Sequence, residues 1–119
     1  MAKFNQPDPR NEGTYCWVNG LVLREDAKVS VLDSVVQGGD AVWEGLRVSD
    51  GRIYQMDEHL KRLVDSAHAL QFADIPPLED VQQAVFHVLA KNGMTDGVHI
   101  RLTLSRGMKS TSGMDPRLN

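Results

Sequence analysis

The sequence has few cysteines, no long apolar stretch and no excess of basic charge. With Cys16 alone, it cannot hold an internal disulfide, which suits a reducing compartment. No apolar run approaches the roughly 20 residues that a membrane-spanning helix needs, and the polar, proline-containing start does not resemble a secretory signal. A net charge of -3 gives no reason to expect nucleic acid or an anionic membrane as a partner. We therefore expect a cytoplasmic protein with neither of these partners.

Metal-binding and nucleotide-binding motifs are missing as well. The four histidines, His59, His68, His87 and His99, have no metal-ligand spacing, so no metal site is expected. No glycine cluster matches a P-loop or a dinucleotide fingerprint, and no Ser/His/Asp combination stands out. The length of 119 residues suits a single domain.

Turn dipeptides and hydrophobic periodicity predict an α+β two-layer sandwich. Asn19-Gly20 and Asp50-Gly51 are strong hairpin signals, because both positions tolerate a positive φ. Asp57 is expected to cap the first long helix. The antiparallel-rich sheet should carry two helices on one face. We expect strands at Tyr15–Val18, Leu21–Leu23, Ala41–Val48, Arg52–Met56 and Val98–Ser105, helices at Glu58–Leu70 and Leu78–Asn92, and a loop at Val35–Asp40.

Changes in composition divide the chain into three parts. Residues 1–13 are expected to form a flexible lead, and residues 14–107 a small α+β domain. Residues 108–119 show no periodicity and are expected to begin an active-site or interdomain loop. Because the chain stops within that loop, we interpret it as a fragment.

Three places in the sequence are candidates for binding a small anion. Arg62 lies off the apolar face of the first long helix and can either meet a phosphate or carboxylate or remain a solvated surface residue. His99 and Arg101 are two apart on the last strand, which is either a plain amphipathic strand or a carboxylate cradle. Trp43 is either a core or interface residue or the wall of a pocket. The loop that follows the last strand adds further cations: Arg106, Lys109 and Arg117.

Three segments in a fixed order resemble a known family. They are WVNGLVLREDAKVSVLD, then GGDAVWEGLRVSDGRIYQMDEHLKRLVDSA, then HIRLTLSRG. Together they resemble the N-terminal small domain of the class IV (fold type IV) pyridoxal-phosphate enzymes, over Tyr15 to Gly107. That family includes branched-chain and D-alanine aminotransferases, (R)-selective amine transaminases and aminodeoxychorismate lyase.

The resemblance implies a transaminase that moves an amino group between an amino acid, branched-chain or similar, and a 2-keto acid. Arg62, in His59-Leu60-Lys61-Arg62-Leu63, corresponds to the ligand of the cofactor phosphate. Trp43, His99 and Arg101 correspond to substrate-pocket positions, and Arg117 corresponds weakly to a carboxylate-binding arginine. The cofactor would be pyridoxal 5'-phosphate, and the complete protein would be a homodimer.

Two departures from the family pattern are visible in the sequence. Many members have Tyr at the position of Gly38 and Phe at the position of Trp43, so the substrate class is open. The Schiff-base lysine belongs to a C-terminal domain that this chain does not include, so the chain alone is expected to be inactive. Two alternatives remain: an aminodeoxychorismate lyase-like enzyme, or a non-catalytic stand-alone binding domain.

Overall fold

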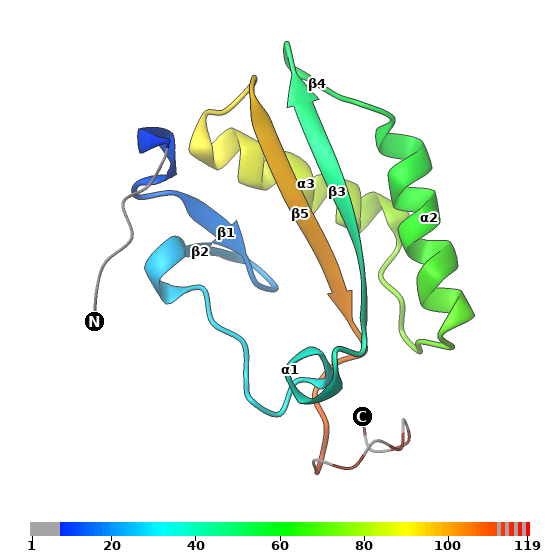
Figure 1. Cartoon of the computed structure of the whole chain (residues 1–119). Helices are drawn as coiled ribbons and strands as arrows, with labels where there is room; N and C mark the ends of the chain where they lie inside the picture. Colours follow the sequence, from blue (N-terminus) through cyan, green and yellow to red (C-terminus); the bar gives the residue numbers. More distant parts are fainter. Residues whose placement is uncertain (1–7, 112, 114, 116, 118) are drawn as a thin grey trace.

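A three-stranded antiparallel sheet in the order β4-β3-β5 organises the molecule. The computed structural model describes residues 8–111, 113, 115, 117 and 119 (Figure 1). A second sheet of two strands, β1 and β2, lies beside the first. The elements are η1 (Pro9–Asn11), β1 (Tyr15–Trp17), β2 (Leu21–Leu23), η2 (Arg24–Asp26), α1 (Ser34–Gly38), β3 (Ala41–Ser49), β4 (Arg52–Ile53), α2 (Met56–Ala69), α3 (Leu78–Asn92) and β5 (Val98–Ser105).

The strand β3 alternates strictly between a covered and an open face. Its even-numbered residues from Val42 to Val48 are buried, whereas the odd-numbered ones are half-buried or exposed. This is the two-residue period of a strand with one covered face. β5 pairs with β3 along nearly its whole length, from Val48↔Val98 to Ala41↔Ser105. Across each pair, residues that point to the same face therefore lie side by side.

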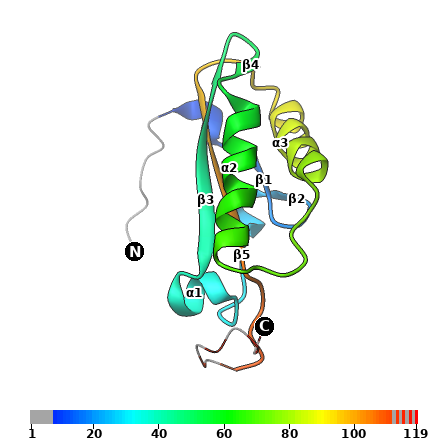
Figure 2. The same ribbon diagram turned by 90° about the vertical axis from the view of Figure 1, so that its right-hand side faces the viewer.

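Two long helices cover the same face of this sheet, as Figure 2 shows. The helix α2 places Leu60, Leu63 and Ala67 inward, at the spacing of one helical face. Leu63 and Ala67 pack with Val42 and Phe72 in the core, and Val81 of α3 lies against this cluster. The expected α+β sandwich, with two helices on one face of an antiparallel sheet, is confirmed.

The boundaries of α3 and β5 agree with the prediction. Pro76-Pro77 precedes the first residue of α3, and Gly93 ends the helix in the left-handed conformation at φ 61°. Asp50 and Gly51 both have a positive φ, 51° and 72°, as the predicted hairpin turn requires.

The prediction was wrong at three points. The strand after the Asp50-Gly51 turn ends at Ile53, and α2 begins at Met56, so Asp57 lies in its first turn and does not cap it. The expected loop at Val35–Asp40 contains the short helix α1, because the Asp33 carboxylate accepts a hydrogen bond from the Val35 backbone amide.

The described part of the expected flexible lead contains a short helix, and its flexibility stays a prediction. Pro9–Asn11 form the short helix η1, and Arg10 donates hydrogen bonds to Asp8 and to the backbone carbonyls of Asp96 and Gly97. Residues 1–7 of that lead lie outside the described residues. Among the helices of the described chain, none is long and apolar enough to cross a bilayer.

Candidate functional site

A carboxylate is buried on the helix-covered face of β3. The Glu44 side chain is only 5% exposed, although its neighbours on that face are the apolar Val42 and Leu46. Burying an ionised carboxylate is costly unless it is paired and hydrogen-bonded. A partner for Glu44 must therefore come from the helix packed above it.

Two residues of α2 supply the partners. Arg62 holds the carboxylate with two parallel bonds, from Nε to Oε2 at 2.9 Å and from Nη2 to Oε1 at 2.7 Å. His59 Nδ1 lies 2.6 Å from Oε1. His59 and Arg62 are three residues apart in the helix and so lie on the same side of it. We call Glu44, His59 and Arg62 the glutamate clamp.

The carboxylate of the clamp is ionised at neutral pH. The hydrogen bonds from Arg62 lower the pKa of Glu44 by more than burial raises it, and the contact with His59 lowers it further. The same pairing raises the pKa of Arg62. The Arg62 side chain is nevertheless 68% exposed, and its Nη1 makes no hydrogen bond within the described part of the chain. Arg62 is therefore an accessible cation with one edge held in place.

The opposite face of the sheet is open and carries the other candidates. The pairs Trp43↔Thr103, Gly45↔Arg101 and Arg47↔His99 place these six residues on one face. The Arg101 guanidinium carbon stacks 3.8 Å from the centre of the Trp43 ring. Trp43 is 56% exposed, so it is not a core residue. The sequence correctly placed His99 and Arg101 together on the face away from the helices.

Gly45 makes room for His99 on this face. A Cβ at position 45 would lie 2.9 Å from His99 Nε2. The imidazole therefore lies directly over the glycine, beside Arg101. The lack of a side chain at Gly45 thus allows a neighbouring side chain to approach closely, and it is not needed for a turn.

Arg62 and the open-face residues do not form one cluster. They lie on opposite faces, because α2 packs against the Glu44 side of β3 while Trp43 points the other way. β4 pairs with β3 only at Val48 and Ser49. Within residues 8–111, no strand pairs with the rest of this edge of β3. The glutamate clamp lies on one side of this unpaired edge, and the open face lies on the other.

The cations of the last loop have other partners than predicted. Arg106 binds the Asp40 carboxylate at 2.5 Å and the Leu70 carbonyl at 2.8 Å, and it stacks on Phe72. Lys109 is buried, with Nζ 3.0 Å from the Gly113 carbonyl. Both residues hold the loop in place, so the expectation that they add to an anion-binding surface was wrong.

Arg117 is exposed and is held by its near neighbour. Its Nε lies 2.9 Å from Asp115 Oδ2. Within the described residues, it makes no hydrogen bond or stacking contact with the predicted pocket residues of the open face. Its assignment to substrate binding therefore stays a prediction.

Sequence reasoning missed Glu44 and the role of His59. The available signal was an acidic residue at a position of β3 where the alternation calls for a buried apolar side chain. Ser105 follows the alternation of His99, Arg101 and Thr103 in β5, but it is half-buried. Its hydroxyl lies 3.1 Å from the hydroxyl of Ser34 and donates a hydrogen bond to the carboxylate of Asp33. These bonds join the end of β5 to the start of α1.

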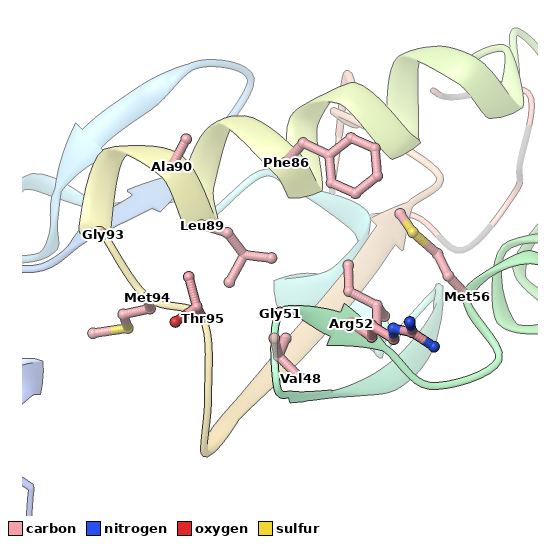
Figure 3. A pocket seen from close by; sticks show the side chains of 11 residues that line it. Val48, Gly51, Arg52, Met56, Phe86, Leu89, Ala90, Gly93, Met94 and Thr95 are labelled. Carbon is pink, nitrogen blue, oxygen red and sulfur yellow. The ribbon is translucent and has the colours of Figure 1, made fainter.

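A separate groove of about 610 Å³ lies between the β3–β4 hairpin and α3 (Figure 3). Its lining is largely apolar, with side chains such as Phe86, Leu89 and Met56, and with Arg52 at one end. None of the predicted site residues borders it. No group of three or more His, Cys, Asp or Glu residues that could bind a metal occurs in the part of the chain the structure describes.

The described residues form a small α+β domain that exposes Arg62 and Arg101 to solvent. The chain belongs to the class IV aminotransferase family, whose model matches residues 41–118.

Proteins with similar sequences include branched-chain aminotransferases and proteins like them. The chain is 56% identical over 114 residues to branched-chain-amino-acid aminotransferase-like protein 1 of Arabidopsis thaliana, covering 95% of this chain and 20% of that protein. It is 35% identical over 86 residues to the Escherichia coli branched-chain-amino-acid aminotransferase, covering 68% of this chain and 28% of that protein.

Solved structures of this family have the same fold. The T.th. branched-chain amino acid aminotransferase, complexed with N-(5'-phosphopyridoxyl)-L-glutamate, matches with a TM-score of 0.78 and 31% identity over 91% of this chain. The match covers 38% of that structure. The chain thus spans between about a fifth and two fifths of the relatives named here.

Proposed function

We propose that this chain is the small domain of a pyridoxal-phosphate-dependent transaminase. Residues 14–107 would form that domain, and residues 108–119 would begin the loop towards a C-terminal domain. The complete protein would exchange an amino group between an amino acid, branched-chain or similar, and a 2-keto acid. The observation that carries this proposal is the exposed guanidinium of Arg62, fixed on one edge by the buried carboxylate of Glu44.

The residues present suit the phosphate of such a cofactor. The ligand of the T.th. relative carries a 5'-phosphate. Arginine suits phosphate because its planar guanidinium donates several N–H bonds in a fixed geometry. Arg62 is exposed, and its Nη1 has no hydrogen-bond partner in the described residues. Arg62 can therefore hold a phosphate without leaving Glu44.

The residues of the open face would orient the substrate. Arg101 can pair with a substrate carboxylate, His99 can donate a further hydrogen bond, and Trp43 can bound the pocket. Pyridoxal phosphate, when bound, supplies the electron sink for the reaction. The lysine that would carry it is expected in the C-terminal domain, so this chain alone would be inactive. The cytoplasmic location and the homodimer are part of the same proposal.

Removal of Arg62 in a full-length protein that contains this chain tests the proposal. Arg62→Ala should weaken retention of pyridoxal phosphate by ~1.5–3 kcal/mol, the scale of a hydrogen bond to a charged group. Lys61→Ala is the matched control, because Lys61 is an exposed cation of the same helix. Cofactor would be titrated against each protein by absorbance. Equal affinities for the Arg62→Ala variant and the unaltered protein would refute the assignment.

A lyase is the second candidate. The 4-amino-4-deoxychorismate lyase of Pseudomonas aeruginosa matches with a TM-score of 0.62 and 27% identity over 76% of this chain. Pyruvate release without exchange of an amino group would favour the lyase, and exchange between an amino acid and a keto acid would favour the transaminase. A stop codon directly after Asn119 in the reading frame would favour a non-catalytic binding domain.

A further inference from the structure

We infer that Glu44 is a positioning residue, which fixes the guanidinium of Arg62 so that its free edge faces a bound phosphate. This inference rests on the proposed function, because it assigns the phosphate to Arg62. Glu44 itself would not touch the cofactor. It would act through its two bonds to Nε and Nη2 of Arg62.

The geometry supports an orienting role. The carboxylate projects from the middle of β3, where pairing with Leu102 of β5 and burial hold the strand in place. Bidentate contact fixes the plane of the guanidinium and not merely its distance. An exposed arginine on a helix otherwise has many rotamers, and ordering it on binding would cost free energy. Because the glutamate clamp already restricts the rotamers of Arg62 in the unbound protein, binding of a phosphate would lose less side-chain entropy.

His59 helps to hold the carboxylate in place. Its Nδ1 lies 2.6 Å from Oε1, the same oxygen that accepts from Arg62 Nη2. The carboxylate is therefore fixed by two side chains of α2 and by its strand. A phosphate that approaches Arg62 would meet a guanidinium whose rotation is already restricted.

Two possible roles of Glu44 predict opposite effects of the Glu44→Gln substitution on cofactor binding. If Glu44 merely occupies Arg62, then Glu44→Gln removes a negative charge near the phosphate and should tighten cofactor binding. If Glu44 positions Arg62, the neutral amide cannot accept both N–H bonds equally well, and binding should weaken. The sign of the change therefore separates the two roles.

The experiment is a double-mutant cycle on cofactor affinity in the full-length protein, with Glu44→Gln, Arg62→Ala and the pair. Where Arg62 is kept, we expect Glu44→Gln to weaken pyridoxal-phosphate binding by about tenfold. In the Arg62→Ala background, we expect the same substitution to weaken it by less than about twofold. Tighter or unchanged binding in Glu44→Gln, or an equal loss in both backgrounds, would overturn the inference. An unchanged affinity in Arg62→Ala alone would instead refute the proposed function.

A measurement on the unaltered protein covers the case in which Glu44→Gln does not fold. In the nitrogen-15 NMR spectrum, the Arg62 Nε–H signal should stay protected from exchange with water before and after cofactor addition, while the Nη signals shift. Loss of Nε–H protection on binding would mean that Arg62 leaves Glu44 to reach the phosphate. That result would contradict positioning by Glu44.

Discussion

The two faces of β3 hold their arginines in different ways. On the covered face, Arg62 is fixed by a buried carboxylate with two short hydrogen bonds. On the open face, Arg101 lies against the Trp43 ring and has no such ion pair among the described residues. The first contact is directional and the second is adaptable, because a ring face attracts a cation over a range of positions. Adjacent residues of one strand, Glu44 and Trp43, therefore hold a rigid cation on one side of the sheet and an adjustable one on the other.

Truncation of side chains on the two faces should give the largest difference in stability. Leu46→Ala on the covered face removes a fully buried side chain, and we expect a loss of about 2–5 kcal/mol of unfolding free energy. Trp43→Ala on the open face should cost about 1 kcal/mol or less, because the ring is already half in water. Urea unfolding followed by circular dichroism measures both. Similar losses for the two variants would show that the open face is also packed.

Acid should weaken the covered face through Glu44. Because the folded pKa of Glu44 lies below its ordinary value of 4.5, its contribution is complete above that pH and is lost as the pH falls through the folded pKa. Glu44→Gln should lower the unfolding free energy by about 1–2 kcal/mol at pH 7, and the gap should narrow below about pH 4.5.

Urea unfolding of both proteins between pH 7 and pH 3 tests this expectation. Asp8, Asp96 and Asp115 also have lowered pKa values, but they are present in both proteins, so the difference between the curves isolates Glu44. A gap that stays constant over the whole range would contradict the expectation.

The smallest effect is expected from Gly45→Ala on the open face. The added Cβ would meet the end of the His99 ring at 2.9 Å, and this exposed side chain can move away at a cost of about 0.5 kcal/mol, as is usual for surface substitutions. The His99 ring signals in a proton NMR spectrum should shift, whereas those of His68 on α2 should not. Unchanged His99 signals would mean that the imidazole does not lie over Gly45 in solution.

The elements predicted correctly from the sequence are those with a regular hydrophobic pattern or with a turn motif at their ends. The alternation in Val98–Ser105 gave β5, and Pro76-Pro77 with Asn92-Gly93 gave the two ends of α3. The start of α2 was missed because the residue before it, Gln55, has a left-handed backbone conformation and forms no side-chain cap, so no capping motif marks this helix start. α1 was missed because its length of five residues is too short for a helical period to appear.

The site was predictable only in part. The exposure of Arg62 followed from its place off the apolar face of α2, and the shared open face of His99 and Arg101 followed from strand alternation. Their roles in binding came from the family resemblance and stay predictions. The pairing of Arg62 with Glu44 depends on how α2 packs across β3, and no local pattern carries that information. The partners of Arg106 likewise come from other segments, the carboxylate of Asp40 and the carbonyl of Leu70.

The unpaired edge of β3 has a consequence for handling the protein. Within the described residues, the backbone groups along much of that edge have no neighbouring strand, and Trp43 and Gly45 provide little charge to discourage one. Such an edge is a template on which another extended chain can add hydrogen bonds. We therefore expect concentrated solutions of the isolated chain to associate by strand addition at this edge, and dilution to reduce that association.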